Sequence, residues 1–173
     1  MTKHVFLIGF MGCGKTYWGS WLAERVSCPF IDLDRRIELH EQKTISDIFR
    51  ETGESGFREL ERRHLHELKD IAPAVIATGG GAPCFFDNLN RMRSTGITIY
   101  LRTPVEVLFE RLKTGKAERP LLKDLNDYEL SGFIRERLET REPFYMQADY
   151  ILEYAEDHDL FAEKLLDVIR NGH

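Results

Sequence analysis

Three glycines, a lysine and a threonine stand close together in the stretch GFMGCGKT at residues 9–16. Four residues separate Gly9 from Gly14, and Lys15 and Thr16 follow at once, which is the spacing of a phosphate-binding loop. Glycines let several backbone N–H groups converge on one point without Cβ clashes. In such a loop the lysine reaches the β and γ phosphates and the threonine hydroxyl binds Mg²⁺. The stretch predicts a nucleoside triphosphate site and leaves the phosphate acceptor open.

Two aspartates follow the second apolar run, in the stretch DLD at residues 32–34. Residues two apart on a strand point to the same side, and the carboxyl ends of parallel strands face the ligand crevice. We therefore expect Asp32 and Asp34 to meet the glycine loop. One would serve Mg²⁺ and the other would hold or deprotonate an acceptor hydroxyl. The alternative is a helix cap, which Asp34 could also provide for the helix that follows.

Later stretches add glycines and arginines. Three successive glycines, Gly79–Gly81, follow a strand-like run and allow a very close backbone approach to a ligand. Arg119 lies in a polar, aperiodic segment at residues 113–126, which is either a lid over the triphosphate or a plain surface loop. Arg58 and Arg141 stand on predicted helices, and their local pattern does not separate a binding role from a solvated or helix-terminal arginine.

Five strand-like runs alternate with helical patterns and predict an α/β fold with a parallel sheet. The runs lie at residues 4–8, 29–33, 74–78, 97–101 and 149–153. Charged helical sequence at residues 34–62 is inserted between the second and third strands and could bind the acceptor. We expect Thr103 to cap a helix that starts at Pro104, and Asp127 to cap the following one.

The composition limits the class of protein. A length of 173 residues predicts one domain, and 42% hydrophobic with 31% charged residues is ordinary for a soluble globular protein. No apolar run approaches the roughly 18 residues of a membrane helix, and we expect no secretory signal. Three cysteines without metal-ligand spacing predict reduced thiols and a cytoplasmic location. The net charge of −5 argues against nucleic acid as a partner, and we expect a monomer.

Taken in order, the stretches GFMGCGKT, DLD, GFRELE, TGGGAP, ERPLL and TREPFY resemble the shikimate kinase family along essentially the whole chain. The resemblance implies an enzyme that transfers the γ-phosphoryl of ATP to the 3-hydroxyl of shikimate, with Mg²⁺, in the aromatic amino acid pathway. It also implies the three-layer αβα phosphate-loop kinase fold with five parallel strands. The alternative is another small hydroxy-acid or sugar-acid kinase of this fold, such as a gluconate kinase. A GTPase is excluded because the sequence lacks Asn-Lys-x-Asp and Asp-x-x-Gly.

The resemblance also implies roles for individual residues. The phosphates would be surrounded by Gly12, Cys13, Gly14, Lys15, Thr16 and Tyr17, with Lys15 on the transferred group and Thr16 on Mg²⁺. Asp32 would hold the metal through water, and Asp34 would bind the shikimate hydroxyls where a base could act. The shikimate site would be completed by Arg58 and Arg141 on the carboxylate, Glu61 beside Arg58, and the backbone of Gly79, Gly80 and Gly81. Arg119 would close with the lid. The sequence departs from the family at Tyr17, where members commonly have Ser or Thr, and near the adenine, where His158 could stand.

Overall fold

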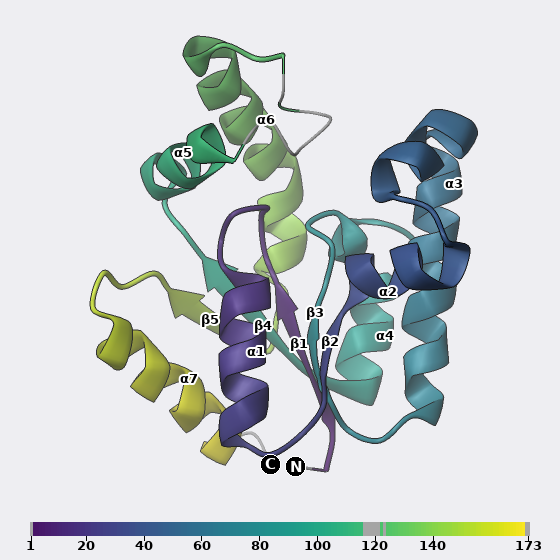
Figure 1. The fold of residues 1–173 in the computed structure, drawn as a ribbon. Coiled ribbons are helices and arrows are strands. Elements are labelled where there is room, and N and C mark those ends of the chain that lie inside the picture. The colour runs from purple at the N-terminus through teal and green to yellow at the C-terminus, as the bar shows by residue number, and fades with distance from the viewer. Residues whose placement is uncertain (1, 116–121, 123, 172–173) are drawn as a thin grey trace.

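The computed structural model describes residues 2–115, 122 and 124–171 (Figure 1). In chain order the elements are β1 (His4–Ile8), α1 (Lys15–Arg25), β2 (Phe30–Asp32), α2 (Leu33–Glu41), α3 (Ile45–Glu67), η1 (Leu68–Asp70), β3 (Val75–Ala77), η2 (Ala82–Cys84), α4 (Asn88–Thr95), β4 (Gly96–Arg102), α5 (Val105–Thr114), α6 (Asp127–Tyr145), β5 (Tyr150–Glu153) and α7 (His158–Asn171). All five predicted strands are present, so the alternation of apolar runs and helical patterns is confirmed.

The five strands form one parallel sheet in the order β2-β3-β1-β4-β5. The first strand lies in the centre, paired with β3 on one side and with β4 on the other. In Figure 1, α1 and α7 lie on one face of the sheet, and α4 and the end of α6 lie on the other. The expected three-layer αβα architecture is therefore confirmed. Parallel strands also bring their carboxyl ends to one edge, where the loops after β1, β2 and β3 meet.

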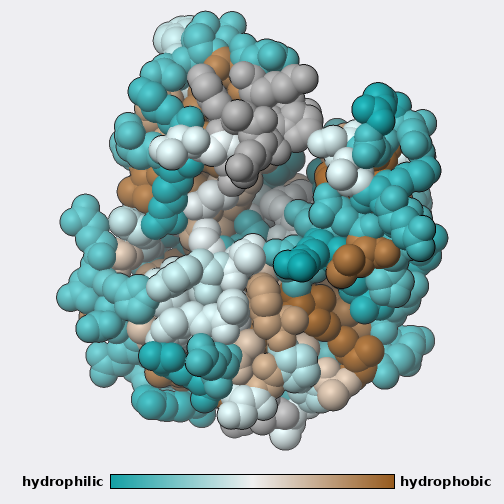
Figure 2. Space-filling view, viewed as in Figure 1, coloured by the Kyte–Doolittle hydropathy of each residue, from teal (hydrophilic) through white to brown (hydrophobic). Residues whose placement is uncertain are grey.

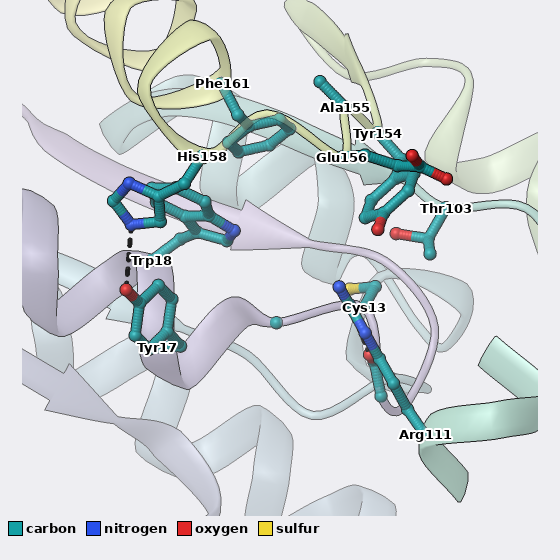
Figure 3. Close-up of a pocket in the computed structure, with 12 residues that line it drawn as sticks. Cys13, Tyr17, Trp18, Thr103, Arg111, Tyr154, Ala155, Glu156, His158 and Phe161 are labelled. Atoms are coloured by element: carbon teal, nitrogen blue, oxygen red, sulfur yellow. Dashed lines mark hydrogen bonds between the residues drawn. The ribbon is translucent and has the colours of Figure 1, made fainter. Parts of the chain in front are cut away.

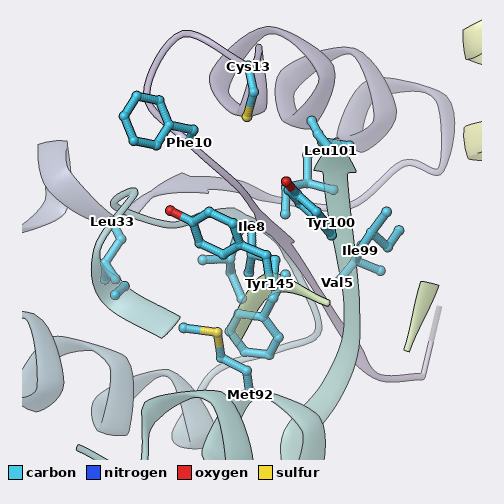
Figure 4. Packing of buried hydrophobic residues seen from close by; sticks show 14 of the residues in the cluster. Val5, Ile8, Phe10, Cys13, Leu33, Met92, Ile99, Tyr100, Leu101 and Tyr145 are labelled. Carbon is cyan, nitrogen blue, oxygen red and sulfur yellow. The ribbon is translucent and has the colours of Figure 1, made fainter. Parts of the chain in front are cut away.

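The core fills the space between the central strands and their helices. Ile8 of β1, Tyr100 of β4, Met92 of α4 and Tyr145 of α6 are buried together (Figure 4). Tyr145 is fully buried, and its hydroxyl donates a hydrogen bond of 2.5 Å to the carbonyl oxygen of Gly80. The end of α6 is thereby held against the loop after β3.

Several helix ends differ from their predicted caps by one or two residues. Asp32 caps α2, because its carboxylate accepts a hydrogen bond from the backbone N–H of Arg35; Asp34 lies inside the first turn. The cap of α6 is Asn126 and not Asp127, and it forms a reciprocal capping box with Glu129. Pro104 is extended and stands just before α5, so the predicted cap at Thr103 is wrong.

Residues 34–62 and 113–126 fit the alternating pattern of strands and helices least, and the structure describes the first segment fully and the second only in part. Residues 34–62 are helical as predicted, in α2 and α3, and α3 kinks at Gly53, where φ is 69°. Within residues 113–126, α5 ends at Thr114 and Asn126 begins the turn into α6. Some of the residues between them, 116–121 and 123, lie outside the described part of the chain, and Arg119 is one of these.

The surface is hollowed above the carboxyl ends of the strands, between the α5–α6 side and the α2–α3 side (Figure 2). Hydrophilic residues predominate on both sides of this hollow. Across the described residues, none of the helices has the length and apolar character to cross a membrane.

Candidate active site

The loop between β1 and α1 has the backbone that its glycines predict. Gly9, Gly12 and Gly14 have φ values of 138°, 81° and 100°, in the region that residues with a Cβ rarely adopt. Gly14 ends the loop and Lys15 begins α1, so the positive end of the helix dipole points into the loop. The Lys15 ammonium donates to the carbonyl oxygens of Gly9 and Phe10, at 2.8 and 2.9 Å. A buried cation thus stands at the anion-binding end of a helix.

Thr16 and Asp32 join the ends of two neighbouring elements. The Thr16 hydroxyl donates to Oδ2 of Asp32 at 2.8 Å, and the other carboxylate oxygen caps α2. Hydroxyl and carboxylate oxygens are the donors that Mg²⁺ prefers, and this ion usually keeps several waters and phosphate oxygens. In the described part of the chain, no group of three or more His, Cys, Asp or Glu could hold a metal by itself. The pair therefore fits an ion that a bound triphosphate helps to hold.

Asp34 lies deeper, in the first turn of α2. Its Oδ1 is buried and has no hydrogen-bond partner among the described residues. Burial raises the pKa of Asp34 to about 6, the Asp32 carboxylate adds to this, and Lys15 and Arg58 oppose it. Asp34 also lines a cavity of about 460 Å³ together with Lys15, Thr16, Asp32 and Gly80. An acceptor oxygen thus lies next to the phosphate loop without a hydrogen-bond partner in the described part of the chain.

Arg58 forms a buried ion pair on α3. Its side chain donates to Glu61 at 2.8 Å and to Glu54 at 3.1 Å, and Arg58 is only 6% exposed. Glu61 is fully buried, and this burial raises its pKa to about 7 against the effect of Arg58. The contact expected between Glu61 and Arg58 is present. A charge this deeply buried is costly unless a ligand or a partner uses it.

The row Gly79–Gly81 brings together four charged groups. A Cβ on Gly79 would lie 2.4 Å from Oε1 of Glu61 and 2.9 Å from Oδ1 of Asp34. A Cβ on Gly81 would lie 2.4 Å from Nη2 of Arg58, and one on Gly80 would lie 3.6 Å from Nη1 of Arg141.

These groups come from α2, α3 and α6. Glycine is needed at positions 79 and 81 because charged groups fill the space that a side chain would take. The two guanidinium groups, far apart in the sequence, meet one short loop.

The model of the shikimate kinase family matches residues 11–170. The chain belongs to this family. A shikimate kinase of Bacteroides thetaiotaomicron is 50% identical over 155 residues, which cover 90% of this chain and 89% of that relative. The crystal structure of a shikimate kinase from the same organism has a TM-score of 0.92 at 45% identity, covering 97% of this chain and 98% of the other. A shikimate kinase from Acinetobacter baumannii, solved in complex with shikimate, has a TM-score of 0.89 at 36% identity, covering 99% and 95%.

Membership of the shikimate kinase family confirms the resemblance carried by the six sequence stretches. The chain is an ATP-dependent kinase, and its phosphate acceptor is shikimate. These matches do not favour the alternative, a kinase of the same fold that acts on another acceptor such as gluconate.

A second cavity of about 350 Å³ continues from the phosphate loop of this shikimate kinase toward α7 (Figure 3). Arg111 donates to the carbonyl oxygen of Gly12 at 3.1 Å, and its guanidinium lies 5.2 Å from the Tyr154 ring. On the opposite side the Tyr17 hydroxyl and His158 Nε2 are 2.9 Å apart. Aromatic side chains line part of the cavity, which suits a nucleobase; they are Tyr17, Trp18, Tyr154, His158 and Phe161.

Two residues that line this cavity, Arg111 and Tyr154, were not predicted from the sequence. Arg111 and Tyr154 lie on an ordinary amphipathic helix and just beyond a short strand, and no local signal separates them from surface residues. His158 lines this cavity, and its place near the nucleotide stays a prediction. Tyr17 is 57% exposed, and its hydroxyl contacts His158. Cys13 is buried, with its sulfur 3.6 Å from the Lys15 ammonium.

Proposed function

We propose that this shikimate kinase binds ATP across the two cavities and shikimate against the glycine row. The cavities share Gly12, Gly14, Tyr17 and Arg111, so one extended ligand can occupy both. The base would lie near Arg111 and Tyr154, and the phosphates would lie over the loop and the first turn of α1. This arrangement directs the γ-phosphoryl toward Asp34 and Gly80, which line the cavity of about 460 Å³.

The observation that carries the proposal is the meeting of Arg58 and Arg141 at Gly80 and Gly81. Both arginines are at most 8% exposed. A guanidinium offers a planar fork of donors that matches a carboxylate, and two forks fix the acid end of a ring. We assign these arginines to the shikimate carboxylate. The glycines let these charged groups approach the loop backbone closely, and Glu61 keeps Arg58 in place.

With the acid end fixed, the reacting hydroxyl would lie near Asp34. Its unpartnered oxygen would accept the hydrogen bond of the hydroxyl and could take the proton as the P–O bond forms. In a loose transition state much of this proton transfer is late, so positioning is the larger part of the role of Asp34. Release of ADP would then follow cleavage of the bond between the γ-phosphorus and its bridging oxygen.

Charge neutralisation at the phosphates would fall to the loop, Lys15, Thr16 and Asp32. We propose that Thr16 and Asp32 hold Mg²⁺, the second of them through water. The ion supplies neutralisation of the β and γ phosphate charges when bound. Lys15 would exchange its bonds to the Gly9 and Phe10 carbonyls for phosphate oxygens, which keeps the ammonium within the loop. Arg119, outside the described residues, would add positive charge from the segment at 113–126.

We also propose that the chain works as a single cytoplasmic domain and a monomer. The glycine row brings together charged groups from α2, α3 and α6, which supports a single domain. Sedimentation at assay concentration tests the monomer, because a stable dimer would move with twice the mass.

The carboxylate clamp is tested with Arg58→Ala and Arg141→Ala, and with exposed Arg135→Ala on α6 as the matched control. Leaving a desolvated carboxylate short of one partner costs about 2–5 kcal/mol. Each clamp variant should therefore weaken the use of shikimate by at least about thirtyfold, while the KM for ATP stays close to that of the parent. A shikimate analogue with a neutral amide in place of the carboxylate should be a poor substrate of the parent. If the amide is phosphorylated as well as shikimate, the clamp is wrong.

A further inference from the structure

Three consecutive residues after η2 dock onto successive turns of α3. The Phe85 ring centroid lies 4.4 Å from the guanidinium carbon of Arg58, and the Phe86 ring lies 5.0 Å from that of Arg62. Asp87 pairs with Arg62 at 3.2 Å. Arg58 and Arg62 are four residues apart on a helix, so they lie one above the other on the same face. The loop therefore follows the helix, with Phe85 on the turn of Arg58 and both Phe86 and Asp87 on the turn of Arg62.

The backbone of this loop is bent in a way that its residue types do not favour. Phe85 is extended, with φ −119° and ψ 146°, and Phe86 has a φ of 52°. A left-handed conformation is uncommon for a residue with a bulky side chain and costs on the order of 1–3 kcal/mol. Consecutive side chains of an extended segment point to opposite sides, so without this bend only one of the two rings would reach α3. The surrounding contacts hold the bend in place.

Arg58 needs such a contact because its hydrogen bonds do not fix its plane. Nη1 donates to Glu61 and Nη2 to Glu54, while Nε is buried without a hydrogen-bond partner among the described residues. Bonds from the two terminal nitrogens locate the end of the side chain but allow the group to tilt. An aromatic face against the guanidinium restricts that tilt and attracts the cation. Phe85 is closer to Arg58 than Phe57, whose ring lies at 5.1 Å.

We propose that Phe85 is a positioning residue that sets the plane of the Arg58 guanidinium for the acceptor carboxylate. The inference rests on the proposed role of Arg58. A planar fork recognises a carboxylate only when the two planes match, so the ring contributes to acceptor selection without touching the acceptor. Phe86 performs the same packing on Arg62, whose side chain is 40% exposed and which we place outside the site. The chain thus provides its own internal control.

The test compares Phe85→Leu with Phe86→Leu and Phe85→Tyr. Leucine keeps an apolar side chain but removes the aromatic face, and tyrosine keeps the face. Phe85→Leu should raise the KM for shikimate, and its dissociation constant by calorimetry, by roughly three- to thirtyfold, with the KM for ATP within about twofold. Phe86→Leu and Phe85→Tyr should stay within about twofold of the parent. Thermal unfolding confirms that each variant is folded, and Phe85→Met replaces the leucine variant if that one is not.

A double-mutant cycle separates this proposal from the role of Arg58 itself. In an Arg58→Ala background, Phe85→Leu should have no further effect on shikimate binding. If Arg58→Ala impairs shikimate binding but Phe85→Leu does not, the positioning role is overturned and the clamp stands. If Arg58→Ala itself has no effect, the proposed function fails first. If Phe86→Leu is as harmful as Phe85→Leu, the loop acts through its general stiffness, and the specific contact with Arg58 is refuted.

Discussion

Gly81→Ala tests whether acceptor binding depends on where one guanidinium lies. Gly81 has φ −88° and ψ −19°, so alanine fits the backbone without strain. Its new methyl carbon, however, would lie 2.4 Å from Nη2 and 2.6 Å from Cζ of Arg58. Unstrained contacts between such atoms need about 3.5 Å, so the guanidinium must move by about 1 Å. It is held by Glu61 at 2.8 Å and is nearly inaccessible to solvent, so the movement breaks that contact or strains it.

A misplacement of about 1 Å in a positioning group can cost about 10²-fold in rate, and overpacking costs about 1–3 kcal/mol of the free energy of unfolding. Steady-state kinetics of Gly81→Ala should thus show kcat/KM for shikimate reduced about hundredfold, with the KM for ATP little changed. Gly132→Ala on α6 is the control, because a Cβ there meets no atom of the described residues within 4 Å. It should keep full activity and gain up to about 1 kcal/mol of stability. A Gly81→Ala enzyme with parental kcat/KM would show that the guanidinium is free to move, and the reasoning from the glycine row would be refuted.

Four further predictions concern the phosphate loop, its Mg²⁺ and the carboxyl of Asp34. Lys15→Ala should fold normally by circular dichroism and lose turnover, and normal turnover of the folded variant would contradict the assignment of the loop. Chelation of Mg²⁺ should abolish the activity of the parent enzyme until the ion is restored. Asp34→Asn should lose far more in kcat than in ATP affinity, because an amide can bind a hydroxyl but cannot take its proton, and an equal loss of ATP affinity would indicate a metal role instead. Burial raises the pKa of Asp34 to about 6, so below that pH the carboxyl is protonated and cannot accept the hydroxyl proton. The value of kcat/KM for shikimate should therefore fall as the pH drops through 6. A pH profile that stays flat down to about pH 5 would argue against this role.

The sequence alone specified the elements whose signals are local. The glycine spacing at residues 9–16 requires a strand before it and a helix after it, and both are present as β1 and α1. Alternating apolar runs and helical patterns predicted five parallel strands, since a parallel connection needs a crossover helix. Helix caps were less predictable. Aspartate and asparagine can both cap at neighbouring positions, and in the structure the caps are Asp32, which accepts from Arg35, and Asn126, which forms a capping box with Glu129.

The arginines of the acceptor site could be anticipated only through family resemblance. By local pattern, Arg58 and Arg141 were ordinary helical arginines, and no pattern indicated Arg111 or Phe85. Their roles depend on which groups meet across the loop after β3, and that is a property of the packed molecule. The crossover connections carry α2, α3 and α6 to the carboxyl ends of the strands, where buried charges of both signs face three glycines. The sequence by itself determined that a phosphate would bind and that a sheet would carry the loop, because backbone geometry and hydrophobic period act over a few residues. Only the tertiary structure decided which charges, distant in the sequence, share one desolvated space beside the three glycines. The interaction between two charges depends on the distance between them in space and on their burial, and not on their separation along the chain.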